Sequence, residues 1–544
     1  MTPNDRPREL GVPERLFVAT MSLLRWLGRL VRGRYVGLVG GPARARVIFL
    51  FGGVLALNSA QVATIGAVAP QLETALHIGN TKIGLLSSAA LVVGALAVIP
   101  VGLVVDRAPR IPLLAASIIA WSVATLLGAV ASSYSSLLLT RLGLGLVAAT
   151  AGPAIASLTG DYFPSQERGR IYAYILGGEI AGTAIGFIVS GTLASLISWR
   201  VSLFVLALPG FFLARSLWRT VPEPKRGGQS RLARGAVDIA GAPDAAEPDG
   251  PDQAGAAPAD EGDLAREAAL RRGVRPNPHL ILLESAASMS LGRAIRYVLR
   301  VPTNVLFIAG SALGYFFLSG LQTFAVVFVR GHYHASQATA TLVLGLLVVG
   351  SLIGTLVSGR ISDALVRRGT LEARVWIPAV CYFAAAALLI PGFVGHSLTP
   401  AIWFDVGGAA FIAAANPPLD AARLDIMPAG LWGRAESTRT FLRSLAQAIA
   451  PLLFGGVADL IAGIEPEQAP IGTHLHKHVN ASASAGLETT FLVMLVSLVA
   501  AGFFILRARD TYATDVATAD ASDRAGAVGP TRVPAGVEKV TDSG

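Results

Sequence analysis

The chain has 544 residues, of which 53% are hydrophobic and only 15% are charged. An ordinary soluble domain carries about 25% charged residues, so this composition excludes a soluble globular protein. The net charge of +9 comes almost entirely from arginines in loops between apolar runs, which indicates a membrane topology signal and not a nucleic-acid-binding face. The single cysteine, Cys381, lies in an apolar run, so no intramolecular disulfide can form.

The first segment, residues 1–45, is basic. Within it, PERLFVATMSLLRWLGRLVRGRY (13–35) mixes Arg with Leu, Trp and Phe and has no small-residue cleavage site. This pattern predicts an amphipathic helix that lies on the inner leaflet, and a basic leader without regular structure is the alternative.

Twelve apolar runs follow, and a run of about 20 residues can cross a bilayer as a helix that satisfies its own backbone groups. The first six, spans 1 to 6, lie at about 46–70, 83–105, 111–131, 136–160, 171–194 and 200–219. Spans 7 to 12 lie at about 303–329, 338–361, 375–395, 399–424, 437–462 and 488–507. The prediction is an all-α membrane protein with two six-helix bundles, residues 46–220 and 301–508, around a central cavity.

The polar stretches outside the bundles are predicted to lack a folded core. Residues 221–300 are rich in Ala, Gly, Pro, Asp and Arg, which predicts a disordered cytoplasmic linker with a short interfacial helix at 279–299. Residues 509–544 are expected to form a disordered cytoplasmic tail.

The distribution of arginines among the loops also predicts the membrane topology. The loops after the even-numbered spans are rich in basic residues, for example Arg107, Arg170 and Arg367. By the positive-inside rule both termini are cytoplasmic, and we expect a multi-pass protein of the plasma membrane.

The two halves match each other in sequence. TAGPAIASLTGDYFPSQERGR (150–170) aligns without gaps on AANPPLDAARLDIMPAGLWGR (414–434), so that Asp161 and Asp425 are 264 positions apart. Gly102 to Asp106 and Gly359 to Asp363 also share the pattern G-x-x-x-D, after the second span of each half. Such parallel repeats are known in secondary transporters, with the substrate site between the halves.

These residues resemble the major facilitator superfamily over about 46–507, apart from the linker. GLVVDRAPR (102–110) resembles the superfamily's loop motif after span 2, and Arg141, Gly145 and Ala149 resemble its span-4 motif. The resemblance implies a secondary active transporter that works by alternating access.

A narrower resemblance is to the spinster-like branch of lipid transporters. LALNSAQVATIGAVAPQLETALHIGNTKIGLLSSA (55–89) and WRVSLFVLALPG (199–210) are similar to it. That branch carries an Asp-Arg pair in span 1, where this chain has Gln61 and Val62, and a Glu in span 4, where it has Ala148. The coupling residues of the branch therefore do not transfer to this chain.

The G-x-x-x-D motif predicts a conformational latch on the inner side. Asp106 ends span 2 at the unfavourable end of the helix dipole, so it needs Arg107, Arg110 or the N-terminus of another span as a partner. The resemblance implies span 11, and Gly102 allows close helix approach. The second half repeats the pair as Gly359 and Asp363. The alternative is a solvated Asp106 beside arginines that only set the topology.

A charge at the bilayer centre is costly, and four charges within predicted spans stand out: Arg141, Glu179, Asp405 and Arg443. The offset of 264 relates Arg141 to Asp405 and Glu179 to Arg443, so opposite charges are expected at matching depths in the two halves. The hypothesis is a polar network around the cavity, with Glu179 as the preferred proton carrier and Asp405 as the second choice. Fixed structural ion pairs are the alternative.

Other polar residues are candidates for the substrate cavity. On span 11, Glu436, Arg439, Arg443 and Gln447 share one helical face, which could bind an anionic head group or anchor the helix to inner-leaflet phosphates. Four amides lie in the spans expected to line the cavity: Asn58, Gln61, Gln322 and Asn416.

The function that follows is a transporter, not an enzyme. The chain has no phosphate-binding G-x-x-x-x-G-K-[ST] loop and no histidine set near a nucleophile, and HLHKH (474–478) is interpreted as a loop and not a metal site. We expect no cofactor, no metal and no nucleic-acid partner, and a monomer in the bilayer. The predicted cargo is a lysophospholipid-like or drug-like amphipathic molecule moved with a proton. The alternatives are a transporter of small polar metabolites and a non-transporting receptor or scaffold.

Overall fold

The computed structural model describes residues 36–163, 165–224, 232, 235–237, 239, 261–283, 289–428, 431–463 and 476–528. Across these ranges the chain folds into helices, and twelve spans are long and apolar enough to cross a membrane. The predicted all-α architecture with twelve transmembrane helices is confirmed. The predicted amphipathic helix at 13–35 lies outside the described residues.

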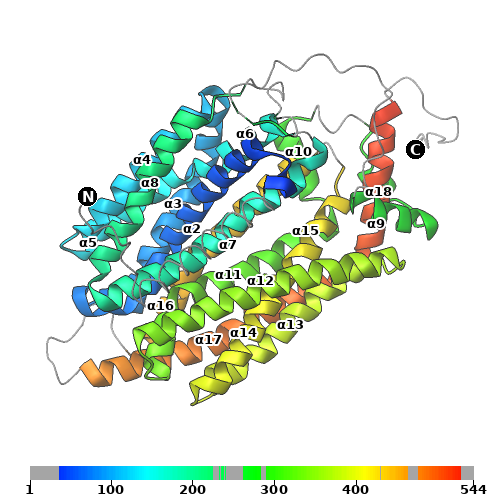
Figure 1. Cartoon of the computed structure of the whole chain (residues 1–544). Helices are drawn as coiled ribbons and strands as arrows, with labels where there is room; N and C mark the ends of the chain where they lie inside the picture. The colour runs from blue at the N-terminus through cyan, green and yellow to red at the C-terminus, as the bar shows by residue number, and fades with distance from the viewer. Residues whose placement is uncertain are drawn as a thin grey trace, which may run out of the picture.

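Each half forms one bundle, and the two bundles lie side by side, blue to teal and green to orange in Figure 1. The N bundle comprises α2 (Pro42–Leu76), α3 (Asn80–Arg107), α4 (Arg110–Ala129), α5 (Tyr134–Ala148), α6 (Ala151–Tyr162), α7 (Ser165–Leu196) and α8 (Trp199–Thr220). The C bundle comprises α11 (Pro302–His332), α12 (Gln337–Arg367), α13 (Ala373–Val394), α14 (Leu398–Ala414), α15 (Asn416–Asp425), α16 (Trp432–Ala462) and α17 (His476–Arg507). An even number of spans returns the chain to one side of each bundle, which we call the inner side in keeping with the predicted topology.

Spans 4 and 10 are each broken into two helices toward the inner side. The breaks separate α5 from α6 and α14 from α15. Pro153 and Pro417, which the sequence repeat aligns, lie in the first turn after each break. Proline is tolerated there because the first N–H groups of a helix have no partner within that helix. The sequence repeat is therefore also a structural repeat.

Glycines allow the closest helix contact in the N bundle, between α7 and α2. Gly178, Gly182 and Gly186 recur every four residues on α7, and each presses against the backbone of α2. Small residues let two helix backbones touch. The contact is so close that a Cβ at Gly182 would overlap the Ala56 carbonyl.

This packing gives a matched pair of substitutions. Gly182→Ala is expected to destabilise the protein by about 1–3 kcal/mol, since the added methyl group must displace the α2 backbone. Gly177→Ala, five residues earlier and with open space around it, is expected to be neutral or to stabilise the helix by up to about 1 kcal/mol. Thermal unfolding of the purified variants measures both effects, and equal shifts would contradict the packing argument.

Polar helices cover the inner end of the C bundle, and Figure 1 labels α9, α10 and α18 among them. They are α9 (Glu261–Arg271), the short 3-10 turn η1 (Pro278–Leu280), α10 (Leu291–Val298) and α18 (Arg509–Val528). The prediction of a disordered linker and tail is therefore wrong for these segments. Within the helix expected at 279–299, the described helical parts are η1 and α10, and residues 284–288 lie outside the described residues.

Specific side-chain contacts explain why these polar segments fold. Asp515 of α18 accepts a hydrogen bond of 3.0 Å from the backbone N–H of Thr303 at the start of α11. Arg266 of α9 forms an ion pair of 2.8 Å with Asp523 of α18. Burial raises the pKa of the Asp515 carboxyl, although its hydrogen bonds with Thr303 act in the opposite direction. Composition does not reveal such contacts, since they join segments more than 200 residues apart.

Candidate functional site

The two bundles meet at their outer ends. Within the described residues, the hydrogen bonds between the bundles join the outer halves of α2 and α3 to those of α12 and α16. Gln337 of α12 donates to the Ala67 carbonyl at 2.8 Å, and the Leu452 N–H donates to Ser88 at 3.1 Å. The two bundles are therefore joined on the outer side.

One carboxylate dominates this outer closure. Asp459 of α16 accepts four hydrogen bonds from the first two residues of α3: from the N–H and side-chain amide of Asn80 at 3.2 and 3.0 Å, and from the N–H and hydroxyl of Thr81, both at 2.7 Å. The N-cap residue, Gly79, has no side chain to cap its own helix, so a carboxylate from the other bundle does so. An anion at a helix N-terminus is favoured by the helix dipole.

Sequence reasoning missed Asp459, although a signal was present. Asp459 is a charged residue within the predicted span 437–462. The residue before α3 is a glycine, which has no side chain that could cap the helix. The repeat-matched position in the N bundle is Ser195, whose hydroxyl bonds to its own helix. This interbundle cap has no counterpart at that repeat-matched position.

A second set of charges lies toward the inner side of the C bundle, and we call it the inner charge cluster. Its members come from α15 and α16: Asp420, Arg423, Glu436, Arg439 and Arg443. Arg423 pairs with Asp420, and Arg439 pairs with Glu436 and lies 3.7 Å from Asp420.

Burial divides the inner charge cluster by sign. The side chains of Arg423 and Arg439 are each 8% exposed, whereas those of Asp420 and Glu436 are 56% and 52% exposed. Arg443 stacks its guanidinium 4.5 Å from the Tyr315 ring centroid of α11. Three arginines against two carboxylates leave the cluster with a net charge of +1 when all five are ionised.

The helix α7 places a carboxylate opposite this cluster. Glu179 is exposed and interacts electrostatically with Arg443 across the space between the bundles. The sequence offset predicted matching depths for these two residues and did not imply direct contact. Their interaction is at longer range than an ion pair, since no Glu179–Arg443 contact within 4 Å occurs among the described side chains.

The other predicted pair is not part of this cluster. Arg141 is buried in the N bundle, 3% exposed, and its Nε and Nη2 atoms have no hydrogen-bond partner among the described residues. Asp405 is 7% exposed and packs against Gly392 of α13, inside the C bundle. The four charges were expected to surround one cavity, but these two lie apart, each within its own bundle.

The inner latch residues have mixed outcomes. The surroundings of Gly102 and of the Asp106 side chain are outside the described part of the structure, and Arg107 is exposed. Arg110 is buried and pairs with Asp161 and, at 2.9 Å, with Glu223. These partners belong to the N bundle, so Arg110 holds the inner ends of spans 3, 4 and 6 together.

The C bundle repeats this arrangement. Arg374, which is 264 positions after Arg110, pairs with Asp425 at 2.6 Å, just as Arg110 pairs with Asp161. Arg374 also lies 3.4 Å from Asp363, the second predicted latch carboxylate. Gly359 contacts Pro417 in the same bundle. The sequence alignment placed Asp161 on Asp425 but did not identify their arginine partners.

Removing one member of this buried pair should be costly. Asp425→Ala is expected to destabilise the protein by about 3–5 kcal/mol, because Arg374 would remain buried without its carboxylate. The double variant Arg374→Leu/Asp425→Leu should recover most of that loss, since it buries no charge. Glu267→Ala, which breaks an exposed pair with Arg271, is the control and should cost at most about 1 kcal/mol. Thermal unfolding compares the three, and a double variant no more stable than Asp425→Ala would contradict the argument.

The predicted amides occupy different environments. Gln322 of α11 lines a small cavity of about 20 Å³ with Val62, Ser319 and neighbouring residues. Gln61 is buried, Asn58 is half-buried, and Asn416 donates to the Ala413 carbonyl at 3.4 Å within its own span. Gln322 therefore borders this cavity between the bundles.

Comparison with known proteins gives the family. The sequence profile of the Major Facilitator Superfamily matches residues 49–451. The uncharacterized transporter YybO of Bacillus subtilis is 26% identical over 186 residues, which cover 34% of this chain and 43% of YybO. The hexuronate transporter of the same organism is 22% identical over 418 residues, 76% of this chain and 87% of the relative.

A solved structure shares the fold. A bacterial homologue of the human lysosomal transporter spinster, in an inward-facing and occupied conformation, superposes with a TM-score of 0.68 at 21% identity, and covers 87% of this chain and 98% of that one. The profile match, the twelve spans and the two repeated bundles agree, and the chain belongs to the Major Facilitator Superfamily of secondary transporters.

Proposed function

We propose that this transporter moves a small amphipathic anion, lysophospholipid-like or drug-like, together with a proton across the plasma membrane. The observation that carries the proposal is the inner charge cluster facing Glu179. An anionic head group would bind Arg439 and Arg443, whose partners leave excess positive charge, and guanidinium groups suit carboxylates and phosphates.

The apolar surroundings favour an amphipathic cargo. Leu176 and Ile180 flank Glu179 on α7, and both are exposed. A molecule with an apolar chain beside its anionic group would cover these side chains while its head group reaches the arginines.

The same geometry suggests how a proton is coupled. Arg443 would attract the ionised form of Glu179 while no anion is bound, since opposite charges attract across the cavity. An anionic substrate at Arg443 would weaken this field and favour proton uptake by Glu179. Substrate and proton would then bind together.

A small organic acid is the second candidate. The hexuronate transporter, to which this chain is similar over most of its length, is named for an acidic sugar. Such a substrate would use the same arginines and differ in having no apolar chain.

The test is transport by the full chain in liposomes that contain a pH-sensitive dye. The panel comprises a lysophosphatidylglycerol, a fatty acid, a hexuronate and a lipophilic cation. Proton flux with the first two supports the proposal, and flux with hexuronate alone selects the second candidate. Flux with the cation alone contradicts anion transport, and folded protein without any flux favours a receptor or scaffold.

Arg443→Gln is expected to lower anion-driven flux at least about tenfold, because the substrate loses a charge-assisted contact. Arg507→Gln removes the same charge from the exposed inner end of α17 and is the control. Equal flux in both variants would remove Arg443 from the binding site.

A further inference from the structure

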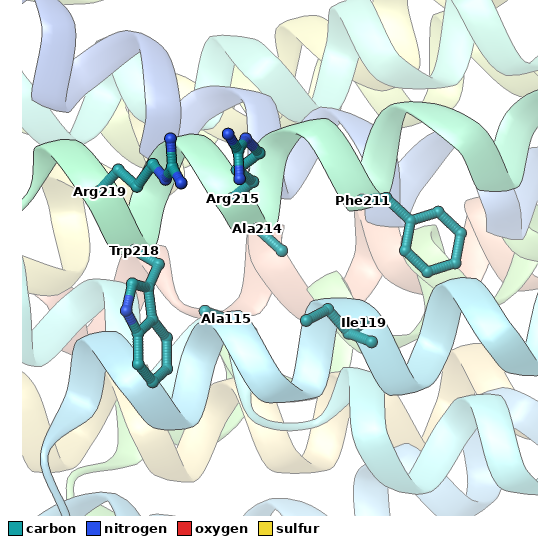
Figure 2. Close-up of a pocket in the computed structure, with 7 residues that line it drawn as sticks. All are labelled: Ala115, Ile119, Phe211, Ala214, Arg215, Trp218 and Arg219. Carbon is teal, nitrogen blue, oxygen red and sulfur yellow. The ribbon is translucent and has the colours of Figure 1, made fainter.

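A groove opens on the outside of the N bundle, away from the inner charge cluster. It lies between α4 and α8 and has a volume of about 240 Å³. Figure 2 shows Phe211 and Ile119 toward one end of the groove, and Trp218 and Arg219 toward the other. The groove is therefore apolar at one end and basic at the other.

Its polarity follows the depth of the membrane. Helix α8 runs inward from Trp199 to Thr220, so Arg215, Trp218 and Arg219 occupy its last two turns at the inner membrane surface. Phe211 lies deeper, in the hydrocarbon region. Trp is typical of the membrane–water boundary, where head groups lie.

The two arginines are available to a ligand. Arg215 and Arg219 are one turn apart on α8, and both are exposed. Neither makes an ion pair or a side-chain hydrogen bond with the described residues, and the groove lining contains no acidic side chain. Two unpaired guanidinium groups beside an apolar channel match a phosphate joined to an acyl chain.

We propose that this groove binds an anionic phospholipid of the inner leaflet. Its phosphate lies between Arg215 and Arg219, and one acyl chain follows Ile119 and Phe211 toward the bilayer centre. The site is on the lipid-facing surface, so it acts apart from the transport cavity and its occupant is not the cargo.

The test measures lipids retained by the full chain in native mass spectrometry, with phosphatidylglycerol and phosphatidylcholine of equal chain length. Wild type is expected to retain phosphatidylglycerol in preference. Arg215→Ala/Arg219→Ala should weaken that binding at least about tenfold, because both charge-assisted contacts are lost. Arg367→Ala/Arg368→Ala removes the same charge from the exposed inner end of α12, outside the groove, and should retain phosphatidylglycerol as wild type does.

A second variant separates the groove from general surface charge. Ile119→Trp keeps both arginines but fills the apolar end, so it should also reduce phosphatidylglycerol binding. Unchanged binding in Ile119→Trp would mean that the groove is not the binding site. An equal loss of binding in the two arginine double variants would mean that net charge alone explains the preference. No preference for phosphatidylglycerol in wild type would overturn the proposal entirely. Unaltered melting temperatures without added lipid establish that the variants are folded.

Discussion

Glu179→Gln is expected to abolish proton-driven accumulation of substrate while leaving substrate exchange in place. Glutamine imitates the protonated carboxyl group, so the bundles can still alternate around a bound substrate, but no proton is taken up or released. Proton flux should fall at least about tenfold, to the level of protein-free liposomes, as expected when a coupling carboxylate is fixed in one charge state. The dye-loaded liposome assay measures flux, and radiolabelled counterflow measures exchange.

The control is a carboxylate in the other bundle, the C bundle. Glu488 of α17 pairs with His332 at 3.2 Å near the outer side, away from Glu179. Glu488→Gln removes the same charge and should preserve coupled transport. If Glu179→Gln keeps wild-type proton flux, another group carries the proton. If it loses exchange as well, Glu179 serves substrate binding or folding and not coupling.

Asp459→Ala is expected to open the outer gate. The carboxylate holds the start of α3 by four hydrogen bonds, and a bond to a charged group contributes about 1.5–3 kcal/mol. Loss of even one such contribution shifts the balance between inward-facing and outward-facing states by about tenfold or more. The variant should populate outward-facing conformations more than wild type does.

Spin labels across the gate measure this shift. Ala75→Cys and Ala338→Cys place labels on exposed positions at the outer ends of the two bundles, in a Cys381→Ser background. Distances should lengthen in Asp459→Ala and change less in Asp459→Asn, which keeps one acceptor oxygen. Ser195→Ala, at the repeat-matched position, is the control. An unchanged distance distribution in Asp459→Ala would mean that backbone packing alone closes the gate.

The gate also explains the glycines at the interface. Gly84 packs against the Pro451 backbone and Gly455 against the Asn80 backbone, so α3 and α16 touch directly where Asp459 acts. Close approach lets a short aspartate side chain reach the neighbouring helix. The gate therefore combines a charge with a surface that only small residues allow.

The sequence by itself determined the twelve spans and their grouping. Each span is a continuous apolar run, and membrane helices satisfy their own backbone groups, so local composition is sufficient to predict them. The gapless repeat also predicted the equivalence of Asp161 and Asp425, because duplicated bundles keep matching residues at matching depths. It likewise related Glu179 of α7 to Arg443 of α16.

Only the tertiary structure decided which groups meet. Asp459 caps a helix that begins 379 residues earlier, and α18 folds because Asp515 reaches α11. Arg141 and Asp405 obey the same sequence offset as Glu179 and Arg443 yet lie apart, since each is buried within its own bundle and an offset does not say which face of a helix meets the other bundle. Contacts between distant segments depend on helix rotation and on the state of the gate, and neither is recorded in the local pattern of residues.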